Sequence, residues 1–218
     1  MDFALARQNM VEGQIRTNRV TDQLVVAALE EMPREAFVPE NLQKLVYIDE
    51  DLTVAPGRIL MEPMVLARLM QAARIEDTDL ALVIAASTGF EAAAIAKLAS
   101  AVIALENVDA MQKAAAENVA AQGADTVSVL SGDLAKGHPG QGPYDVIFIN
   151  GAAEELPDAL TEQLAEGGRL VYVKAASAIA GGKAMLVTKD NGVVSEAELF
   201  DANIPTLAEF TAAPKFTF

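Results

Sequence analysis

The residues best suited to hold a ligand stand directly after predicted strands. Residues 82–93 read LVIAASTGFEAA, a buried strand that passes straight into a helix, and the loop between them holds one glycine, Gly89. Glu106 ends the next predicted strand and follows that loop by about twenty residues, a spacing at which a carboxylate accepts hydrogen bonds from ribose hydroxyls. The pair indicates an adenosine-containing ligand; the alternative is that Glu106 is only a polar residue at a strand end.

Other kinds of chemistry are disfavoured by the composition. The chain has no cysteine, which excludes disulfides, thiolate metal sites and cysteine nucleophiles. Its single histidine, His138, lies in a loop with proline and glycine, where a surface role is more common than a catalytic one, and we expect no metal site. A nicotinamide oxidoreductase is a poorer interpretation, because a dinucleotide loop needs glycines to admit the pyrophosphate.

The charge of the chain limits its partners. Its 218 residues include 16 Lys and Arg against 31 Asp and Glu, a net charge of −15. This balance disfavours nucleic acids and anionic membrane surfaces. The N-terminus has no continuous apolar run like that of a signal peptide, and the longest apolar runs fall short of the roughly 20 residues that span a bilayer. We therefore expect a cytoplasmic protein that binds neither membranes nor nucleic acid.

Two regions of different character must position these residues. Residues 4–16 and 21–32 carry apolar residues at helical spacing, and Thr21 or Asp22 is placed to cap the second helix. After a less regular stretch, Pro63 suits the first turn of a further helix. We expect residues 1–76 to form a helical extension packed on a main α/β domain, residues 77–218.

From residue 80 onward, strands and helices alternate. Strands are predicted at 80–86, 101–106, 126–130, 144–150 and 169–173, and helices at 90–100, 108–123 and 156–168. Such alternation predicts a mainly parallel sheet with helices on both faces. The sequence Asp190-Asn191-Gly192 between two β-rich runs is typical of a hairpin, so the sheet should end in an antiparallel pair. Ligands of such sheets bind beyond the carboxyl ends of the strands.

Several longer motifs add a resemblance to a known family. They are MVEGQI, MPREAFVPE, YIDEDL, SGDLAKGHPGQGPYDVIFINGAAEELPDAL and QLAEGGRLV. In these motifs, from about Met10 to Val173, the chain resembles protein-L-isoaspartate O-methyltransferases, S-adenosylmethionine-dependent enzymes that methylate isoaspartyl carboxylates in damaged proteins. The resemblance implies a Rossmann-like methyltransferase sheet of seven strands, S-adenosyl-L-methionine as cofactor, and a protein or peptide as substrate.

The cofactor loop departs from the family pattern. The family reads approximately Gly-x-Gly-Ser-Gly where this chain has Ala85 to Gly89, so Ala85 and Ser87 replace glycines. Glycine there permits unusual φ angles and a close approach of backbone to ligand, and we expect weaker cofactor binding. The resemblance also assigns Glu106 and Asp133 to the adenosine. Leu134 stands where the family often has glycine, and either packs on the adenine or fills the pocket.

The matching substrate motif is altered as well. Met61 stands where the family has a serine in an Ile-Ser-Gln-Pro-like run, and Glu62 follows it. Because a carboxyl group with a pKa of about 4 is already ionised at neutral pH, methyl transfer to it needs alignment rather than a base. Loss of the hydroxyl should slow the reaction rather than abolish it. The carboxylate of Glu62 would repel the substrate carboxylate. Arg58 can offset this repulsion by pairing with the substrate anion; the commoner alternative is that Arg58 is an ordinary exposed arginine.

Two functional hypotheses follow. The first is a methyltransferase of the isoaspartyl type, slower or retargeted to another acceptor. The second is a non-catalytic relative that keeps the fold and binds a protein partner. We place the methyltransferase first, because Glu106 and Asp133 are retained. The oligomeric state does not follow from the sequence.

Overall fold

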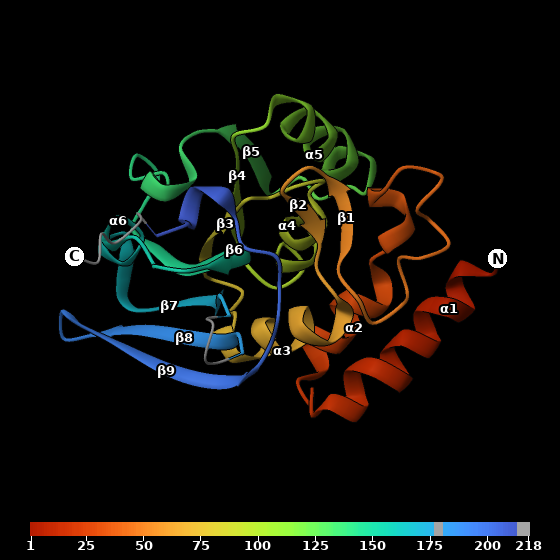
Figure 1. Cartoon of the computed structure of the whole chain (residues 1–218), viewed down its shortest axis with the longest axis horizontal. Coiled ribbons are helices and arrows are strands. Elements are labelled where there is room, and N and C mark those ends of the chain that lie inside the picture. Colours follow the sequence, from red (N-terminus) through yellow and green to blue (C-terminus); the bar gives the residue numbers. More distant parts are fainter. Residues whose placement is uncertain (177–180, 213–218) are drawn as a thin grey trace, which may run out of the picture.

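A seven-stranded sheet forms the centre of the protein (Figure 1). The computed structural model describes residues 1–176 and 181–212. The strand order is β5-β4-β3-β6-β7-β8-β9. The strands are β3 (Leu80–Ile84), β4 (Ala101–Glu106), β5 (Val127–Ser131), β6 (Tyr144–Ala153), β7 (Leu164–Lys174), β8 (Lys183–Asp190) and β9 (Val193–Asp201). The neighbouring strands β5, β4, β3, β6 and β7 run parallel to one another. Strands β8 and β9 each pair antiparallel with the preceding strand. The predicted fold class is confirmed.

The local sequence explains both kinds of pairing. Residues 81–84 of β3 are fully buried, as expected for a central strand covered by helices on both faces. Asn191 and Gly192 have φ angles of +50° and +75°, the left-handed pair that a two-residue hairpin turn requires. The chain returns from β5 to β6 beside β3, so the carboxyl end of β3 is the switch point at which ligands bind in such sheets.

Four helices pack on this sheet. They are α3 (Pro63–Ala73), α4 (Phe90–Ile95), α5 (Asp109–Ala121) and α6 (Asp158–Glu162). Pro63 occupies the first turn of α3, as predicted. Helix α6 is shorter than the predicted 156–168, because the carbonyl of Gln163 accepts a hydrogen bond from the Tyr144 N–H (2.8 Å) and the chain then enters β7. None of the helices in the described ranges is long and apolar enough to cross a membrane.

The N-terminal residues form short helices and one hairpin, which are joined by turns at residues 40–50. They form α1 (Phe3–Met10), a π-helical turn η1 (Val11–Ile15), a 3-10 turn η2 (Arg16–Asn18), α2 (Gln23–Glu31) and η3 (Arg34–Phe37). The Asp22 side chain caps α2 by accepting hydrogen bonds from two backbone N–H groups. The stretch expected to be irregular contains the antiparallel pair β1 (Leu52–Ala55) and β2 (Arg58–Leu60).

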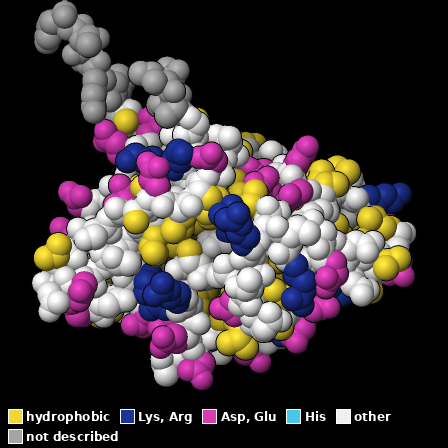
Figure 2. All heavy atoms as spheres, turned by 90° about the horizontal axis from the view of Figure 1, so that it is seen from below, with side chains coloured by type: hydrophobic (Ala, Val, Ile, Leu, Met, Phe, Trp, Pro, Cys, Tyr) yellow, Lys and Arg dark blue, Asp and Glu magenta, His cyan; other side chains and the backbone are white. Residues whose placement is uncertain are grey.

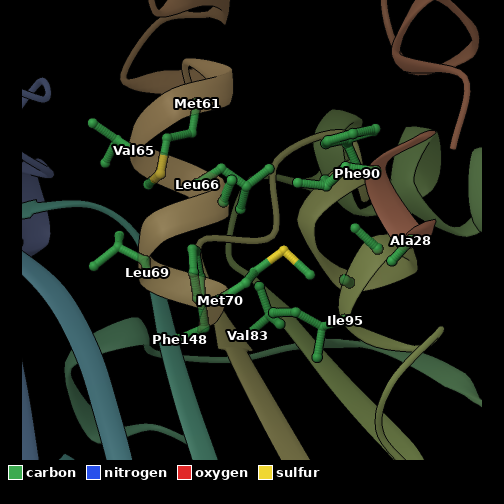
Figure 3. Close-up of a cluster of buried hydrophobic side chains, with 14 of the residues drawn as sticks. Ala28, Met61, Val65, Leu66, Leu69, Met70, Val83, Phe90, Ile95 and Phe148 are labelled. Carbon is green, nitrogen blue, oxygen red and sulfur yellow. The ribbon is translucent and has the colours of Figure 1, made fainter. Parts of the chain in front are cut away.

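The N-terminal region and the sheet share one hydrophobic core. In Figure 3, Met61 and Met70 from the α3 region lie in the same cluster as Val83 of β3, Phe90 of α4 and Ala28 of α2. The division of the chain after residue 76 remains an interpretation.

The chain after β9 returns to the carboxyl edge of the sheet (Figure 1). The Leu207 N–H donates to the carbonyl of Ala152 (2.9 Å), and the Ala152 N–H donates to the carbonyl of Pro205 (3.0 Å). Gly151 permits this approach, because a Cβ there would lie 2.6 Å from Leu207 Cγ. The 3-10 helix η5 (Ala208–Phe210) follows, so the return segment 203–212 lies where a ligand of the sheet would bind.

Candidate cofactor and substrate site

The loop after β3 keeps a glycine-like backbone without most of the glycines. Ala85, Ser87 and Gly89 all have positive φ, at +57°, +53° and +92°. Residues with a side chain rarely adopt positive φ, and each one that does lowers the folding stability by on the order of 1 kcal/mol. Gly89 begins α4 and packs closely on α5, where a Cβ would meet Ala115 Cα at 3.2 Å. The loop therefore retains the backbone shape expected of the family although two side chains have been added.

The carboxylate of Glu106 is fully buried at the end of β4 and surrounded by donors. Its Oε2 accepts a hydrogen bond from the Ser87 N–H (2.9 Å). Its Oε1 accepts from the N–H groups of Asn107 (2.9 Å) and Val108 (3.0 Å). The Nε of Arg58 lies 3.0 Å from both oxygens. The predicted proximity of Glu106 to the loop is thus observed, and both of its oxygens are engaged within the chain.

The side chain of Arg58 links the Glu106 carboxylate to Asn107 and Glu209. It is 3% exposed, and its Nη2 donates to Asn107 Oδ1 (2.6 Å) and to Glu209 Oε1 (2.8 Å). Burial lowers the pKa of the guanidinium, but Glu209 and Glu106 more than offset this, so its pKa lies above the ordinary value. The interpretation of Arg58 as an ordinary exposed arginine is therefore wrong, because the β1–β2 hairpin carries it against the end of β4. Its observed partners are carboxylates of the chain itself.

Met61 belongs to the hydrophobic core. Its side chain is completely buried beside the first turns of α3 (Figure 3). Its N–H donates to Glu91 Oε1 (3.2 Å), and its carbonyl accepts from Arg34 Nη2 (2.7 Å). The backbone of Met61 thus lies between two buried ionisable residues, while its thioether contributes packing. A role of Met61 in the reaction stays a prediction.

Acidic groups gather around the start of α3. The Asp51 carboxylate accepts a hydrogen bond from the Glu62 N–H (2.9 Å). Burial raises the pKa of Glu62 to about 7, with further contributions from Asp51, Asp49 and Glu50. Burial also raises the pKa values of Asp51 to about 6 and of Glu91 to about 7. Among the described residues, no three acidic or histidine side chains gather in a metal-binding arrangement.

Asp133 and Leu134 have different surroundings. Asp133 is exposed before the 3-10 turn η4 (Leu134–Lys136), where it accepts a hydrogen bond from the Ala135 N–H (3.1 Å) and pairs with Lys136 (3.0 Å). A hydrogen bond from Lys136 lowers the pKa of Asp133. Leu134 is buried in the apolar cluster that includes Ala85 and Leu207. Of the two alternatives for Leu134, this position favours filling of the space near the strand ends.

Some of the buried side-chain atoms without a hydrogen-bond partner in the described residues lie at this site, and others, such as Gln14 Oε1, lie elsewhere. Within the described part of the chain, Ser87 Oγ, Thr88 Oγ1 and Asn150 Oδ1 form no hydrogen bond. Asn150 lies between β2 and the loop, since its Nδ2 donates to the carbonyls of Ile59 (3.4 Å) and Ala85 (3.3 Å). Buried polar groups in native proteins normally have partners, and exceptions often mark a functional site. The pattern therefore indicates a place that receives a polar ligand.

The cofactor implied by the family resemblance does not fit these residues in the conformation described. The carboxylate that should accept the ribose hydroxyls, Glu106, is buried and fully engaged, and Arg58 lies against it. The return segment also brings Glu209 onto the same guanidinium. A nucleoside can reach Glu106 only after Arg58 has moved.

The sequence missed Glu209 and Glu91 as members of the site. Glu209 follows Glu106 by more than a hundred residues, and no local motif connects them. Glu91 lies within the predicted helix after the loop, where its burial was not apparent from the pattern. The β1–β2 hairpin did leave a signal, because the Pro56-Gly57 dipeptide between β-branched residues is typical of a turn.

Comparisons with known proteins match this chain to one family. Residues 5–199 match the family model described as Protein-L-isoaspartate(D-aspartate) O-methyltransferase (PCMT). A protein-L-isoaspartate O-methyltransferase of Methanoculleus marisnigri is 37% identical over 165 residues, 76% of this chain and 75% of that protein. Protein-L-isoaspartate O-methyltransferase 1 of Rhodopseudomonas palustris (strain HaA2) is 38% identical over 169 residues, 78% of this chain and 69% of that protein.

Solved structures show the same fold. A protein-L-isoaspartate O-methyltransferase structure superposes with a TM-score of 0.78 at 24% identity, covering 92% of this chain and 65% of the other. A Plasmodium falciparum structure, described as such an enzyme in complex with S-adenosyl-L-homocysteine, also has a TM-score of 0.78 at 21% identity, covering 93% and 98%. The fold, the loop and the extent of the match lead to one conclusion: the chain belongs to the S-adenosylmethionine-dependent protein-L-isoaspartate O-methyltransferase family.

Proposed function

We propose that this protein is a protein-L-isoaspartate O-methyltransferase that uses S-adenosyl-L-methionine to methylate isoaspartyl carboxylates in proteins. The observation that carries the proposal is the loop after β3. Ala85, Ser87 and Gly89 keep the left-handed backbone of a glycine loop, and the Ser87 N–H reaches Glu106. A loop without a ligand to bind would have no evident reason to retain two strained non-glycine residues.

The chain's own contribution to the reaction is positioning. An isoaspartyl carboxylate is ionised at neutral pH, so it needs alignment rather than deprotonation. The acidic groups at the start of α3 oppose an anionic substrate, and their protonation reduces that repulsion because the pKa values of Glu62 and Asp51 are about 7 and about 6. We therefore assign Met61 and Glu62 to the surroundings of the substrate rather than to proton transfer.

The test is methyl transfer to an isoaspartyl peptide, with the same peptide carrying ordinary aspartate as the control. Labelled S-adenosylmethionine should give a base-labile methyl ester on the isoaspartyl peptide only. The assay should be run between pH 6 and pH 8 at millimolar cofactor, because the loop and Arg58 predict weak binding. A folded protein that labels neither peptide across this range would contradict the proposal.

Two observations favour a second function. Arg58 fills the position beside Glu106, and the family's serine position is occupied by the core residue Met61. A non-catalytic relative that binds a protein partner would need neither an open ribose position nor that hydroxyl. Absence of methyl transfer together with absence of cofactor binding would favour this alternative.

The partners that we propose are proteins or peptides, in the cytoplasm, without nucleic acid. On the face that Figure 2 shows, acidic and basic side chains are mixed rather than gathered into one basic surface. The net charge of −15 also opposes binding to polyanions.

A further inference from the structure

We propose that Arg58 sets the affinity of the cofactor site by occupying the positions of the ribose hydroxyls beside Glu106. Its guanidinium takes the hydrogen bonds of Glu106 that a ribose diol would otherwise make, so cofactor binding must displace it. The inference rests on the proposed function, because it takes an adenosine-containing ligand as the occupant of this site.

Hydrogen-bond accounting identifies Arg58 as the exchangeable donor. A carboxylate offers about four acceptor positions. Three of the donors to Glu106 are backbone N–H groups, from Ser87, Asn107 and Val108, and these are fixed by the loop and by the chain leading into α5. The remaining donor is the Arg58 side chain. A ligand hydroxyl can therefore reach Glu106 only by replacing the guanidinium.

Glu209 holds the guanidinium from the outer side. It accepts hydrogen bonds from Arg58 Nη2 (2.8 Å) and Asn107 Nδ2 (2.9 Å). These bonds, with a smaller contribution from the charge of Arg58, lower its pKa despite its partial burial. Leu207 and Phe210 of the same return segment pack in the apolar cluster that includes Ala85 and Leu134. The closed arrangement thus joins the β1–β2 hairpin, the end of β4 and the return segment through one side chain.

The closed arrangement also leaves polar groups unsatisfied. Ser87 Oγ, Thr88 Oγ1 and Asn150 Oδ1 are buried without partners in the described part of the chain. Leaving such groups unpaired opposes the closed state, whereas the ion pairs of Arg58 favour it. A polar ligand that bonds to these atoms shifts the balance toward an open state by its differential affinity. The free energy needed to break the ion pairs of Arg58 then reduces the observed affinity for the ligand.

The test is calorimetric titration with S-adenosylhomocysteine, comparing the wild type with Arg58→Gln. The substitution removes the charge and leaves a shorter polar side chain, which withdraws the guanidinium from Glu106 and Glu209. Because a hydrogen bond to a charged group contributes on the order of a tenfold change in a binding constant, we expect about tenfold tighter binding by the variant. Arg74→Gln is the control, since Arg74 follows α3 and its carbonyl accepts a hydrogen bond from Arg169 rather than from the residues around Glu106; the affinity of this variant should equal that of the wild type.

A second ligand separates displacement from general loosening. An analogue of S-adenosylhomocysteine without the 2′ and 3′ hydroxyls cannot use the freed acceptors of Glu106. Arg58→Gln should therefore gain affinity for S-adenosylhomocysteine but not for the analogue. Equal gains for both ligands, or no gain for either, would overturn the proposal.

Glu209→Gln tests the same idea if Arg58→Gln does not fold. This variant keeps the Arg58–Glu106 pair and weakens only the outer anchor, so the gain for S-adenosylhomocysteine should be smaller but present. An unchanged affinity of Glu209→Gln in that case would overturn the inference. Binding by Arg58→Gln without methyl transfer would leave the inference standing and would contradict the proposed function instead.

Discussion

Arg58 and Met61 acquire their roles from neighbours that are distant in the sequence. Arg58 lies between Glu106 and Glu209 and is almost completely buried. Met61 lies in the core, while its backbone contacts Glu91 and Arg34. At both positions the family resemblance suggested contact with a substrate, and the observed contacts are with other parts of the chain.

Glu91 provides a prediction at the same scale. Its carboxyl group is fully buried, and burial raises its pKa to about 7. A raised pKa means that the folded state favours the protonated form, so this stabilisation is present below pH of about 4.5 and is lost as the pH rises toward 7. Glu91→Gln, which keeps the acceptor for the Met61 N–H, should gain stability relative to the wild type by about 3 kcal/mol between pH 4.5 and pH 8.

Urea unfolding at both pH values measures this difference. Glu117→Gln is the control, because Glu117 is an exposed glutamate on α5 with only a long pair to Lys113. A difference between Glu91→Gln and the wild type that does not change with pH would show that the pKa of Glu91 is not raised in the folded state.

At the scale of elements, the central sheet was predictable and its ends were less so. The buried runs of β3 and β6 and the turn at Asn191-Gly192 carry strong local signals, and these elements were confirmed. The length of α6 was not predictable, because a hydrogen bond between Tyr144 and Gln163 ends the helix. The candidate site was predictable only in part, because it also depends on contacts between distant residues. The loop and Glu106 follow a known spacing in the sequence, whereas Glu209 reaches them through tertiary structure.

The return segment 203–212 gives a prediction at this scale. Leu207 is buried against Gly151 and the apolar cluster. Leu207→Ala should loosen the segment, at a cost of about 2–5 kcal/mol in its docking, and amide hydrogens of residues 203–212 should exchange faster. Leu24→Ala, at a leucine that is 67% exposed, is the control. Unchanged exchange in Leu207→Ala would mean that the backbone bonds to β6 hold the segment without this side chain.

At the scale of the whole molecule, the site is made by three distant parts of the chain. The β1–β2 hairpin brings Arg58, the sheet brings the loop and Glu106, and the return segment brings Glu209. These contacts explain how a member of a methyltransferase family can keep its cofactor loop and still hold the ribose position closed. The family therefore defines the chemistry, while Arg58 and the return segment define when the cofactor can enter.

The most direct test of this account is the KM for S-adenosylmethionine in methyl transfer to an isoaspartyl peptide, measured for the wild type and Arg58→Gln side by side. The account predicts transfer by both proteins, with a KM about tenfold lower in the variant and the same preference for isoaspartyl over aspartyl peptide. No transfer by either folded protein, or an equal KM for both, would contradict it.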